Sequence, residues 1–183
     1  LRADASSRFG SDNKWGYFPS IALGWTVSNE DFFPSGSAIS FLKVRASTGR
    51  LGNQNIPNYA YLSLFSREGN ITRYGNPQLR WESTLQNNLG VDMRFMGNKL
   101  EVIADVFQKK TKDILLAVSL PTFIGNVDAT YVNAGQVDNA GFELSTRYRD
   151  RINDKGNFSF GGNITGINNK VVALHENVPR IIG

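Results

Sequence analysis

The chain has 183 residues, of which 40% are hydrophobic and 20% charged, and its formal net charge is +4 at pH 7. This composition is that of a folded domain, and no run approaches the roughly 18 apolar residues that a membrane helix needs. The absence of cysteine excludes disulfides and thiolate metal sites, and the scattered Lys and Arg form no stripe of the kind that follows nucleic-acid phosphates, so we expect no nucleic-acid partner.

Apolar and polar side chains alternate with a period of two along much of the chain, which is typical of β-strands with two different faces. The alternating stretches lie, in chain order, at 17–27, 42–48, 85–95, 100–108, 142–148 and 158–164. Together with the fragmentary residues 1–6, they predict an all-β chain of about seven antiparallel, up-and-down strands. We expect residues 1–183 to form a single unit, and the start at Leu1 without a methionine suggests a piece of a longer protein.

The segment "MRFMGNKLEVIADV", residues 93–106, predicts a β-hairpin with a two-residue Gly97-Asn98 turn. Such a turn places Phe95 opposite Leu100 on one face. It also places Arg94 opposite Glu101 on the other face. A slip by one residue would bring acidic side chains among the apolar ones, so the turn and the alternation specify the same register.

The two faces of the predicted sheet differ in charge. No position on the apolar face of the six stretches is charged, although charged residues make up 20% of the chain. The polar face carries more charge than a soluble sheet needs, which is ordinary for the wet lumen of a membrane barrel. The candidate lumen-facing residues are Lys43, Arg45, Asp92, Arg94, Glu101 and Glu143.

Short and long connections alternate along the chain, which places the long loops at one end of the sheet. The connections at 97–98 and 150–156 are short and 28–39 is moderate, whereas 50–79 and 110–139 are long. The stretch from Leu85 to Phe95, tilted by about 40°, covers roughly 25 Å of height, which fits an outer-membrane barrel. A soluble β-sandwich that binds a ligand and buries the apolar face in a core is the alternative.

Aromatic side chains lie near both ends of the apolar face, where an interfacial girdle of a membrane barrel would be. At the short-turn end we expect Trp25, Phe95, Tyr148, Phe158 and Phe160, and near the other rim Tyr17 and Trp81.

Five blocks of the sequence, in order and almost end to end, resemble the SusC/RagA family of TonB-dependent outer-membrane transporters. They are "LRADASSRFGSDNKWGYFPSIALGWTVSNEDFF" (1–33), "LKVRASTGRLGNQNI" (42–56), "GNPQLRWESTLQNNLGVD" (75–92), "DVFQKKTKDILL" (105–116) and "NAGQVDNAGFELSTRYR" (133–149). The resemblance implies a 22-stranded transmembrane β-barrel in the cell outer membrane of Bacteroidetes, of which this chain forms part of the later barrel.

The same resemblance implies a function and partners. These are import of glycan oligomers or peptides, a SusD-like surface lipoprotein as a lid, energy supplied through the TonB complex, contact with outer-membrane lipid, and no cofactor. The plug domain and the segment that contacts TonB fall outside residues 1–183, so no energy-coupling role is expected here.

Aromatic residues of the long loops are candidates for contact with ligand or lid, although packing of loop against loop explains them equally well. They are Tyr59, Tyr61, Phe65, Tyr74, Phe123 and Tyr131.

Catalytic and metal sites are not expected. His175 is the single histidine, so neither a histidine triad nor a multi-histidine metal site can form. Carboxylate pairs of the glycosidase type are conceivable, but these carboxylates alternate with basic or polar neighbours, which favours charge balance in a lumen over catalysis. They are Glu82, Asp92, Glu101, Asp105 and Glu143.

Overall fold

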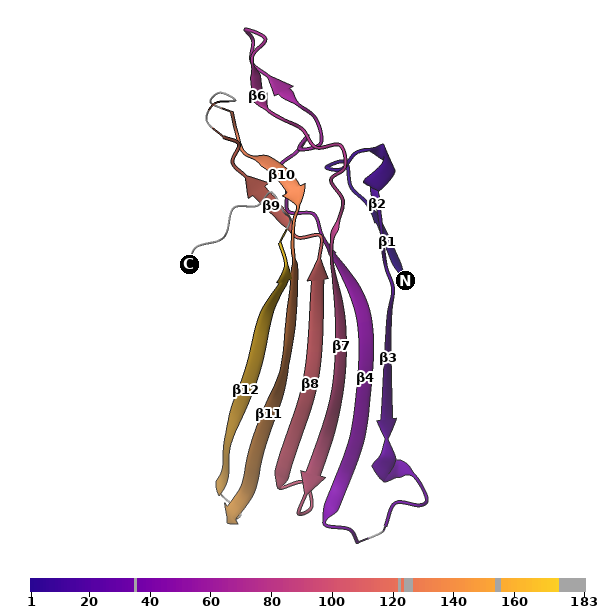
Figure 1. Cartoon of the computed structure of the whole chain (residues 1–183). Helices are drawn as coiled ribbons and strands as arrows, with labels where there is room; N and C mark the ends of the chain where they lie inside the picture. The colour runs from indigo at the N-terminus through magenta and orange to yellow at the C-terminus, as the bar shows by residue number, and fades with distance from the viewer. Residues whose placement is uncertain (35, 122, 124–126, 154–155, 175–183) are drawn as a thin grey trace.

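A computed structural model describes residues 1–34, 36–121, 123, 127–153 and 156–174 of the chain. Figure 1 shows one tall layer of long strands, with short turns and the moderate β3–β4 loop at one end and longer loops with small hairpins at the other. No helix among these residues is long and apolar enough to cross a membrane. His175, which we expected in a solvent-facing loop, lies outside the described residues.

The strands and short 3₁₀ helices follow one another along the chain. In order they are β1 (Arg2–Ala5), η1 (Ser11–Asn13), β2 (Trp15–Phe18), β3 (Ser20–Thr26), η2 (Val27–Asn29), β4 (Ile39–Asn53), β5 (Leu64–Phe65), β6 (Ile71–Arg73), β7 (Glu82–Phe95), β8 (Leu100–Lys112), β9 (Leu115–Val118), β10 (Thr130–Asn133), β11 (Gln136–Asn153) and β12 (Gly156–Ala173).

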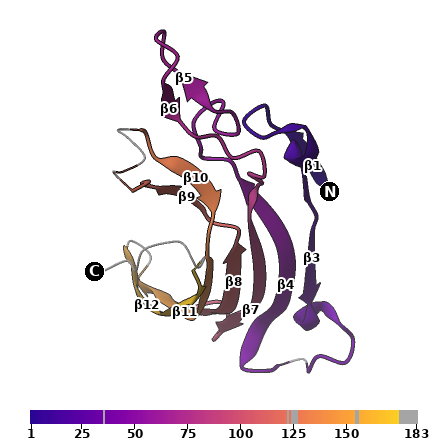
Figure 2. The same cartoon turned by 45° about the horizontal axis from the view of Figure 1, so that its top comes forward.

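Six of these strands form one antiparallel sheet in the order β12-β11-β8-β7-β4-β3. Long strands that are neighbours in the sequence are therefore neighbours in space, which confirms the all-β, up-and-down prediction. The seventh predicted strand is represented by β1, which pairs with β2 at the loop end. Figure 2 shows that the sheet is curved and open, with β3 and β12 at its two edges.

The register predicted for the β7–β8 hairpin is confirmed. Phe95 lies opposite Leu100 and Arg94 opposite Glu101. The backbone N–H of Lys99 donates to the carbonyl of Met96, 3.4 Å away. Gly97 and Asn98 both have positive φ, 63° and 71°, as a two-residue turn between right-twisted strands requires.

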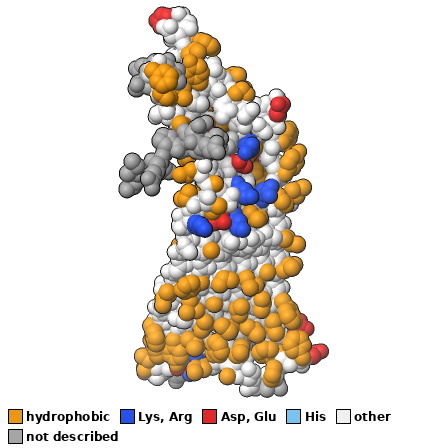
Figure 3. All heavy atoms as spheres, viewed as in Figure 1, with side chains coloured by type: hydrophobic (Ala, Val, Ile, Leu, Met, Phe, Trp, Pro, Cys, Tyr) orange, Lys and Arg blue, Asp and Glu red, His pale blue; other side chains and the backbone are white. Residues whose placement is uncertain are grey.

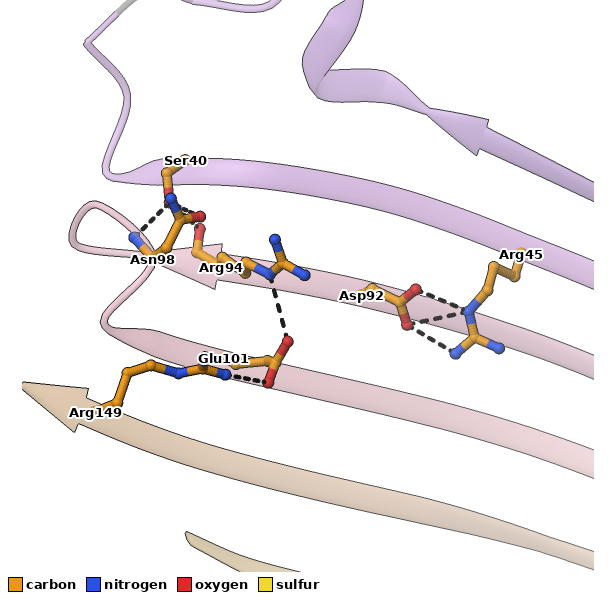
Figure 4. Close-up of polar contacts among 7 residues, drawn as sticks. All are labelled: Ser40, Arg45, Asp92, Arg94, Asn98, Glu101 and Arg149. Carbon is orange, nitrogen blue, oxygen red and sulfur yellow. Dashed lines mark hydrogen bonds and ion pairs between the residues drawn. The ribbon is translucent and has the colours of Figure 1, made fainter. Parts of the chain in front are cut away.

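A β-bulge at Ser40 in the neighbouring strand fixes this turn in place, and the sequence pattern gave no sign of it. The pairing of β4 with β7 shifts between Ile39 and Phe41, which leaves Ser40 out of the ladder. Its hydroxyl accepts a hydrogen bond from the backbone N–H of Asn98 and donates one to the carbonyl of Arg94, both at 3.1 Å (Figure 4).

The predicted stretch 17–27 is two strands rather than one. Proline at position 19 lacks the N–H that a ladder needs, so the strand is interrupted between β2 and β3. At its other end Val27 begins the 3₁₀ helix η2 instead of continuing the strand. The other predicted stretches are all found, and each is longer than the alternation alone indicated.

The apolar face is confirmed as free of charge over most of its height. Directly opposed residues form uncharged rows across the sheet: Ile39, Phe95, Leu100, Tyr148 and Phe160; Leu42, Met93, Val102, Thr146 and Gly162; Trp25, Val44, Val91, Ala104, Leu144 and Ile164; Leu23, Ala46, Leu89, Val106, Phe142 and Gly166; Ile21, Thr48, Asn87, Gln108, Ala140 and Asn168. Figure 3 shows this face as a broad apolar band near the short-turn end.

The band is shorter than predicted by one row. Leu85 points to the same face, but its direct neighbours in the row are Arg50 and Lys110. From Asn87 to Phe95 the uncharged rows extend about 27 Å along the strand at 3.4 Å per residue. Side chains of the apolar face stay exposed, with Leu23 at 69% and Ile164 at 65%, and no second sheet of the described residues covers them. A sandwich would require such a cover.

Aromatic side chains gather at the short-turn end of the band, as expected. The rings of Tyr148, Phe158 and Phe160 lie within 5.5–6.3 Å of one another. Trp25, which we also expected at this rim, lies further along the face, in the row of Val44 and Val91, where it contacts Phe32 edge to face with centroids 6.2 Å apart. Aromatic rings at one rim are the arrangement found where a barrel wall meets a membrane interface.

The buried core of the described residues lies among the loops and not under the sheet. It consists of Phe9, Ile56, Ala60 and Leu79, and Leu79 is completely inaccessible. Trp81, predicted near the outer rim, instead packs on Phe9 with ring centroids 5.2 Å apart. Loop-to-loop packing therefore holds the long-loop end together, while the sheet itself relies on its strand ladder.

Candidate functional site: the charged face and the loop end

The face opposite the apolar band carries the charged residues that alternation placed there. Lys43 lies directly opposite Asp92, and Arg94 opposite Glu101. Asp105 lies opposite both Gly90 and Glu143. All six predicted lumen-facing residues thus share one face of four adjacent strands. That this face lines a lumen remains a prediction.

Arg45 connects three strands through two carboxylates. Its guanidinium donates to both oxygens of Asp92, with the shortest contact at 2.8 Å, and to Oδ2 of Asp105 at 3.1 Å (Figure 4 shows the Asp92 contacts). Arg45 and Asp105 lie on strands that both flank β7, where Gly90 is the residue between them. A glycine at that position leaves room for the two side chains to meet above the backbone.

We expect Gly90→Ala to destabilise the folded protein by about 1–3 kcal/mol, the usual cost of forcing atoms into a filled site. A Cβ at Gly90 would collide with the carboxylate of Asp105 and the guanidinium of Arg45. The matched control is Gly162→Ala, where an added Cβ meets no atom within 4 Å. Denaturant unfolding of the full-length protein measures both. Equal stability of the two variants would contradict the packing described.

A second ion-paired group lies nearer the short-turn end (Figure 4). Glu101 accepts hydrogen bonds from Arg94 at 3.4 Å and from Arg149 at 3.2 Å, so one carboxylate joins β7, β8 and β11. The guanidinium of Arg94 also lies 4.8 Å from the ring centroid of Phe41. This cation–π contact positions the arginine from the β4 side.

Lys43 and Glu143 are the two predicted residues that the ion-pair groups do not include. Among the described residues neither has an opposite charge within 4 Å. The stem of Lys43 lies over Gly24. Glu143 lies opposite Asp105, so two acidic side chains face the same direction side by side. Arg147, opposite Glu101 on the same face, also has no ion pair among the described residues, so this face keeps charges of both signs that no described residue neutralises.

Sequence reasoning left Arg149 out of the candidate list. It lies one residue beyond the predicted strand 142–148, yet β11 continues to Asn153 and keeps its alternation. The polar face of that stretch consists of its odd-numbered residues, so continuing the alternation by one more residue would have identified Arg149. Asp105, a charge of the polar face that we weighed as a glycosidase carboxylate and left out of the lumen-facing candidates, is one of the two partners of Arg45.

At the loop end, one asparagine joins the two long loops. The side-chain amide of Asn133 donates to the carbonyls of Arg80 and Asp113, both at 2.8 Å, and its Oδ1 accepts from the N–H of Arg80 at 2.9 Å. Arg80 and Asp113 also form an ion pair at 2.6 Å, and the carboxylate raises the pKa of Arg80. Asn133 therefore connects the segment before β7 with the segment after β8, although the two are far apart in the sequence.

The six loop aromatics do not form one cluster. Tyr59 is 59% exposed, and Phe65 in β5 and Phe123 are also exposed. Tyr61 and Tyr74 are half-buried. Tyr131 in β10 packs against the loop core of Phe9, Ile56, Ala60 and Leu79. Three of the six therefore offer open ring surface, and Tyr131 has a packing role whatever else it contacts.

The comparisons with known proteins agree on one family. The model of the TonB-dependent receptor-like β-barrel matches residues 1–180. TonB-dependent receptor P3 of Formosa agariphila is 34% identical over 96% of this chain and 18% of its own length. TonB-dependent receptor SusC of Bacteroides thetaiotaomicron is 32% identical over 95% of this chain and 19% of its own length.

Solved structures give the same result. The RagAB peptide importer in its closed-closed state matches with a TM-score of 0.86 and 28% identity over 96% of this chain and 20% of the other. In its open-open state the TM-score is 0.80, over 94% of this chain. The chain spans about a fifth of the length of the relatives it matches.

Proposed function

The chain belongs to the TonB-dependent receptor β-barrel family, and from this membership we propose that it is a stretch of barrel wall in a transporter importing glycan oligomers or peptides. The family, which includes SusC and RagA, consists of outer-membrane transporters and receptors, and the cell outer membrane is the location of this chain. We propose no catalytic role for it.

One observation carries the proposal: the sheet has an uncharged face without a cover and a charged face with internal ion pairs. A single layer of strands with these two faces is suited to separate lipid from a wet passage. Short turns at one end and long loops at the other fit the periplasmic and outer sides of such a wall. The whole of residues 1–183 then acts as one partial segment of a larger barrel.

In this proposal the wall is static while cargo passes. The chain matches RagAB in both the closed-closed and the open-open state, with TM-scores of 0.86 and 0.80, so the fold of this wall is found in both. Lys43 and Glu143, which have no ion pair among the described residues, line the passage together with the paired Arg45, Asp92, Arg94 and Glu101.

The cargo and partners are assigned by relationship. RagAB is described as a peptide importer, which supports peptides as cargo. The resemblance to the SusC/RagA family supports glycan oligomers and a SusD-like lipoprotein as a lid over the long loops. Energy reaches the transporter through the TonB complex and parts of the protein outside this chain.

Fractionation and uptake of the full-length protein test the proposal together. We expect the protein in the membrane fraction, released only by detergent, and uptake of labelled oligosaccharide or peptide that stops when TonB is deleted. Recovery in the aqueous fraction would refute the barrel wall. Uptake of neither cargo class by a protein correctly placed in the membrane would refute the assigned transport.

Replacing Tyr59 and Tyr61 together by alanine tests the loop contacts. We expect uptake or lid affinity to fall about tenfold, because a stacked aromatic ring contributes about 0.5–1.5 kcal/mol beyond its area. The control is Phe32→Ala, an exposed aromatic on the short-turn side. Binding of the lipoprotein and rate of uptake are measured for each. Unchanged values for both would remove the two tyrosines from the candidate list.

A further inference from the structure

A row of basic residues crosses the apolar face just beyond its uncharged rows, on the loop side. Three of them belong to one line of directly opposed residues across the sheet, which contains, in order, Arg50, Leu85, Lys110, Asp138 and Lys170. Lys112 follows on the same face one step further along β8. We call Arg50, Lys110, Lys112 and Lys170 the basic row. In Figure 3 basic side chains gather above the apolar band, separated from it by a strip of uncharged polar surface.

The cations of the basic row are not neutralised within the part of the chain that the structure describes. None of the four has a carboxylate within 4 Å there, and all four lie close together on one face, whereas three of the arginines on the charged face, Arg45, Arg94 and Arg149, are ion-paired. The one acid in the row, Asp138, accepts a hydrogen bond from the side chain of Gln136. Four neighbouring cations without an ion pair among the described residues, set against the single acid Asp138, make this part of the face attractive to an external anion.

The height of the basic row identifies the kind of anion. From Leu89, in the last predominantly apolar row, to Leu85 the chain rises about 14 Å along the strand, or roughly 10 Å along the membrane normal at a tilt of about 40°. This distance places the side chains in the headgroup region, where long basic side chains reach lipid phosphates. The uncharged Asn87 row lies between, at the level of the lipid ester groups.

The two rims of the apolar face differ in a way that matches two different leaflets. At the short-turn rim the outward side chains are aromatic, and Lys99 there is paired with Asp150 at 2.8 Å, which raises the lysine pKa. At the loop rim they are unpaired cations. An anionic ligand is therefore expected only at the loop rim.

We propose that the basic row binds phosphate groups of the glycolipid in the outer leaflet and so fixes the depth of this wall segment in the membrane. The inference rests on the proposed function, because it requires the apolar face to meet lipid. Electrostatic attraction to each phosphate, strengthened by low-dielectric surroundings, supplies the affinity.

The test compares two full-length variants that lose equal charge. The first carries Lys110→Gln, Lys112→Gln and Lys170→Gln. The control carries Lys14→Gln, Arg67→Gln and Arg151→Gln, which are exposed cations outside the row. Purified protein in detergent is titrated with lipid A, with chemically dephosphorylated lipid A, and with lipid A in the presence of millimolar inorganic phosphate, and bound lipid is measured by native mass spectrometry.

We expect lipid A to bind the first variant on the order of 100-fold more weakly than wild type, about fivefold for each cation lost. The control should bind like wild type, and dephosphorylated lipid A should bind wild type weakly. Equal binding of lipid A by both variants would overturn the inference. Displacement of lipid A by millimolar inorganic phosphate would assign the site to free phosphate instead.

The same preparations separate this inference from the transport proposal. A protein that requires detergent and imports cargo, yet binds lipid A equally well in both variants, refutes only the lipid site. A protein recovered in the aqueous fraction refutes the barrel wall, and the lipid site with it.

Discussion

Replacing Ala104 by arginine will destabilise the full-length protein in a lipid bilayer by about 2–4 kcal/mol, whereas the same change at Gln108 will cost at most about 1 kcal/mol. Both residues lie on the apolar face of β8. Ala104 belongs to a middle row with Val91, and Gln108 belongs to the last uncharged row, next to the basic row. The penalty for a charge facing lipid falls from the bilayer centre toward the interface, because an interfacial arginine reaches water.

The depth dependence distinguishes a membrane wall from a buried core. Urea titration of the full-length protein folded into lipid vesicles measures both substitutions. The control is Ser145→Arg on the charged face of β11, which we expect to change stability by less than about 1 kcal/mol because surface substitutions rarely do more. In the interior of a sandwich, arginine would be costly at both 104 and 108. Equal losses at these two positions would therefore contradict a lipid-facing surface.

Arg45→Met will destabilise the protein by about 2 kcal/mol, because it removes a guanidinium that donates hydrogen bonds to two carboxylates. The arginine side chain is 33% exposed and Asp105 only 16%. Without Arg45 the carboxylates of Asp92 and Asp105 lose their cation. Glu143, directly opposite Asp105, adds like-charge repulsion.

A second substitution tests this cause. Arg45→Met combined with Asp105→Asn should lose about 1 kcal/mol less than Arg45→Met alone, since the amide removes one of the stranded charges. The matched control combines Arg45→Met with Glu82→Gln, a carboxylate far from the pair that bonds Asn53 and the N–H of Leu115. Denaturant midpoints of the single and double variants are compared. A loss in the first double variant equal to or larger than in Arg45→Met would contradict the charge argument.

The sheet could be predicted from the sequence because its determinants are local. Alternation assigns each side chain to a face, and the Gly97-Asn98 turn fixes which residues oppose each other. These two signals gave the β7–β8 register and the shared face of Arg94 and Glu101, as found. The alternation of apolar and polar residues is weaker at strand ends, so the predicted strands ended too early and Arg149 was omitted.

The loop end could not be predicted in the same way, because its contacts join residues far apart in the chain. Nothing in the alternation indicates that Asn133 bonds the backbone of Arg80, or that Trp81 turns inward onto Phe9. The Ser40 bulge is a further example, since a single residue out of register changes no composition. The basic row likewise depends on strand pairing, because Arg50, Lys110 and Lys170 come from three strands that the sheet brings together.

The order of pairing also bears on how this segment folds. Each long strand pairs with the long strand before or after it, so the wall grows by adding hairpins to an existing edge and needs no distant part of the chain. Only about four residues separate the strands of the β7–β8 hairpin and about two separate those of β11–β12, so we expect these two hairpins to form first and to act as nuclei. The long loops slow the next additions only slightly, since closure entropy grows with the logarithm of loop length. We then expect the two hairpins to join through β8 and β11, and β4 and β3 to be added to the β7 edge.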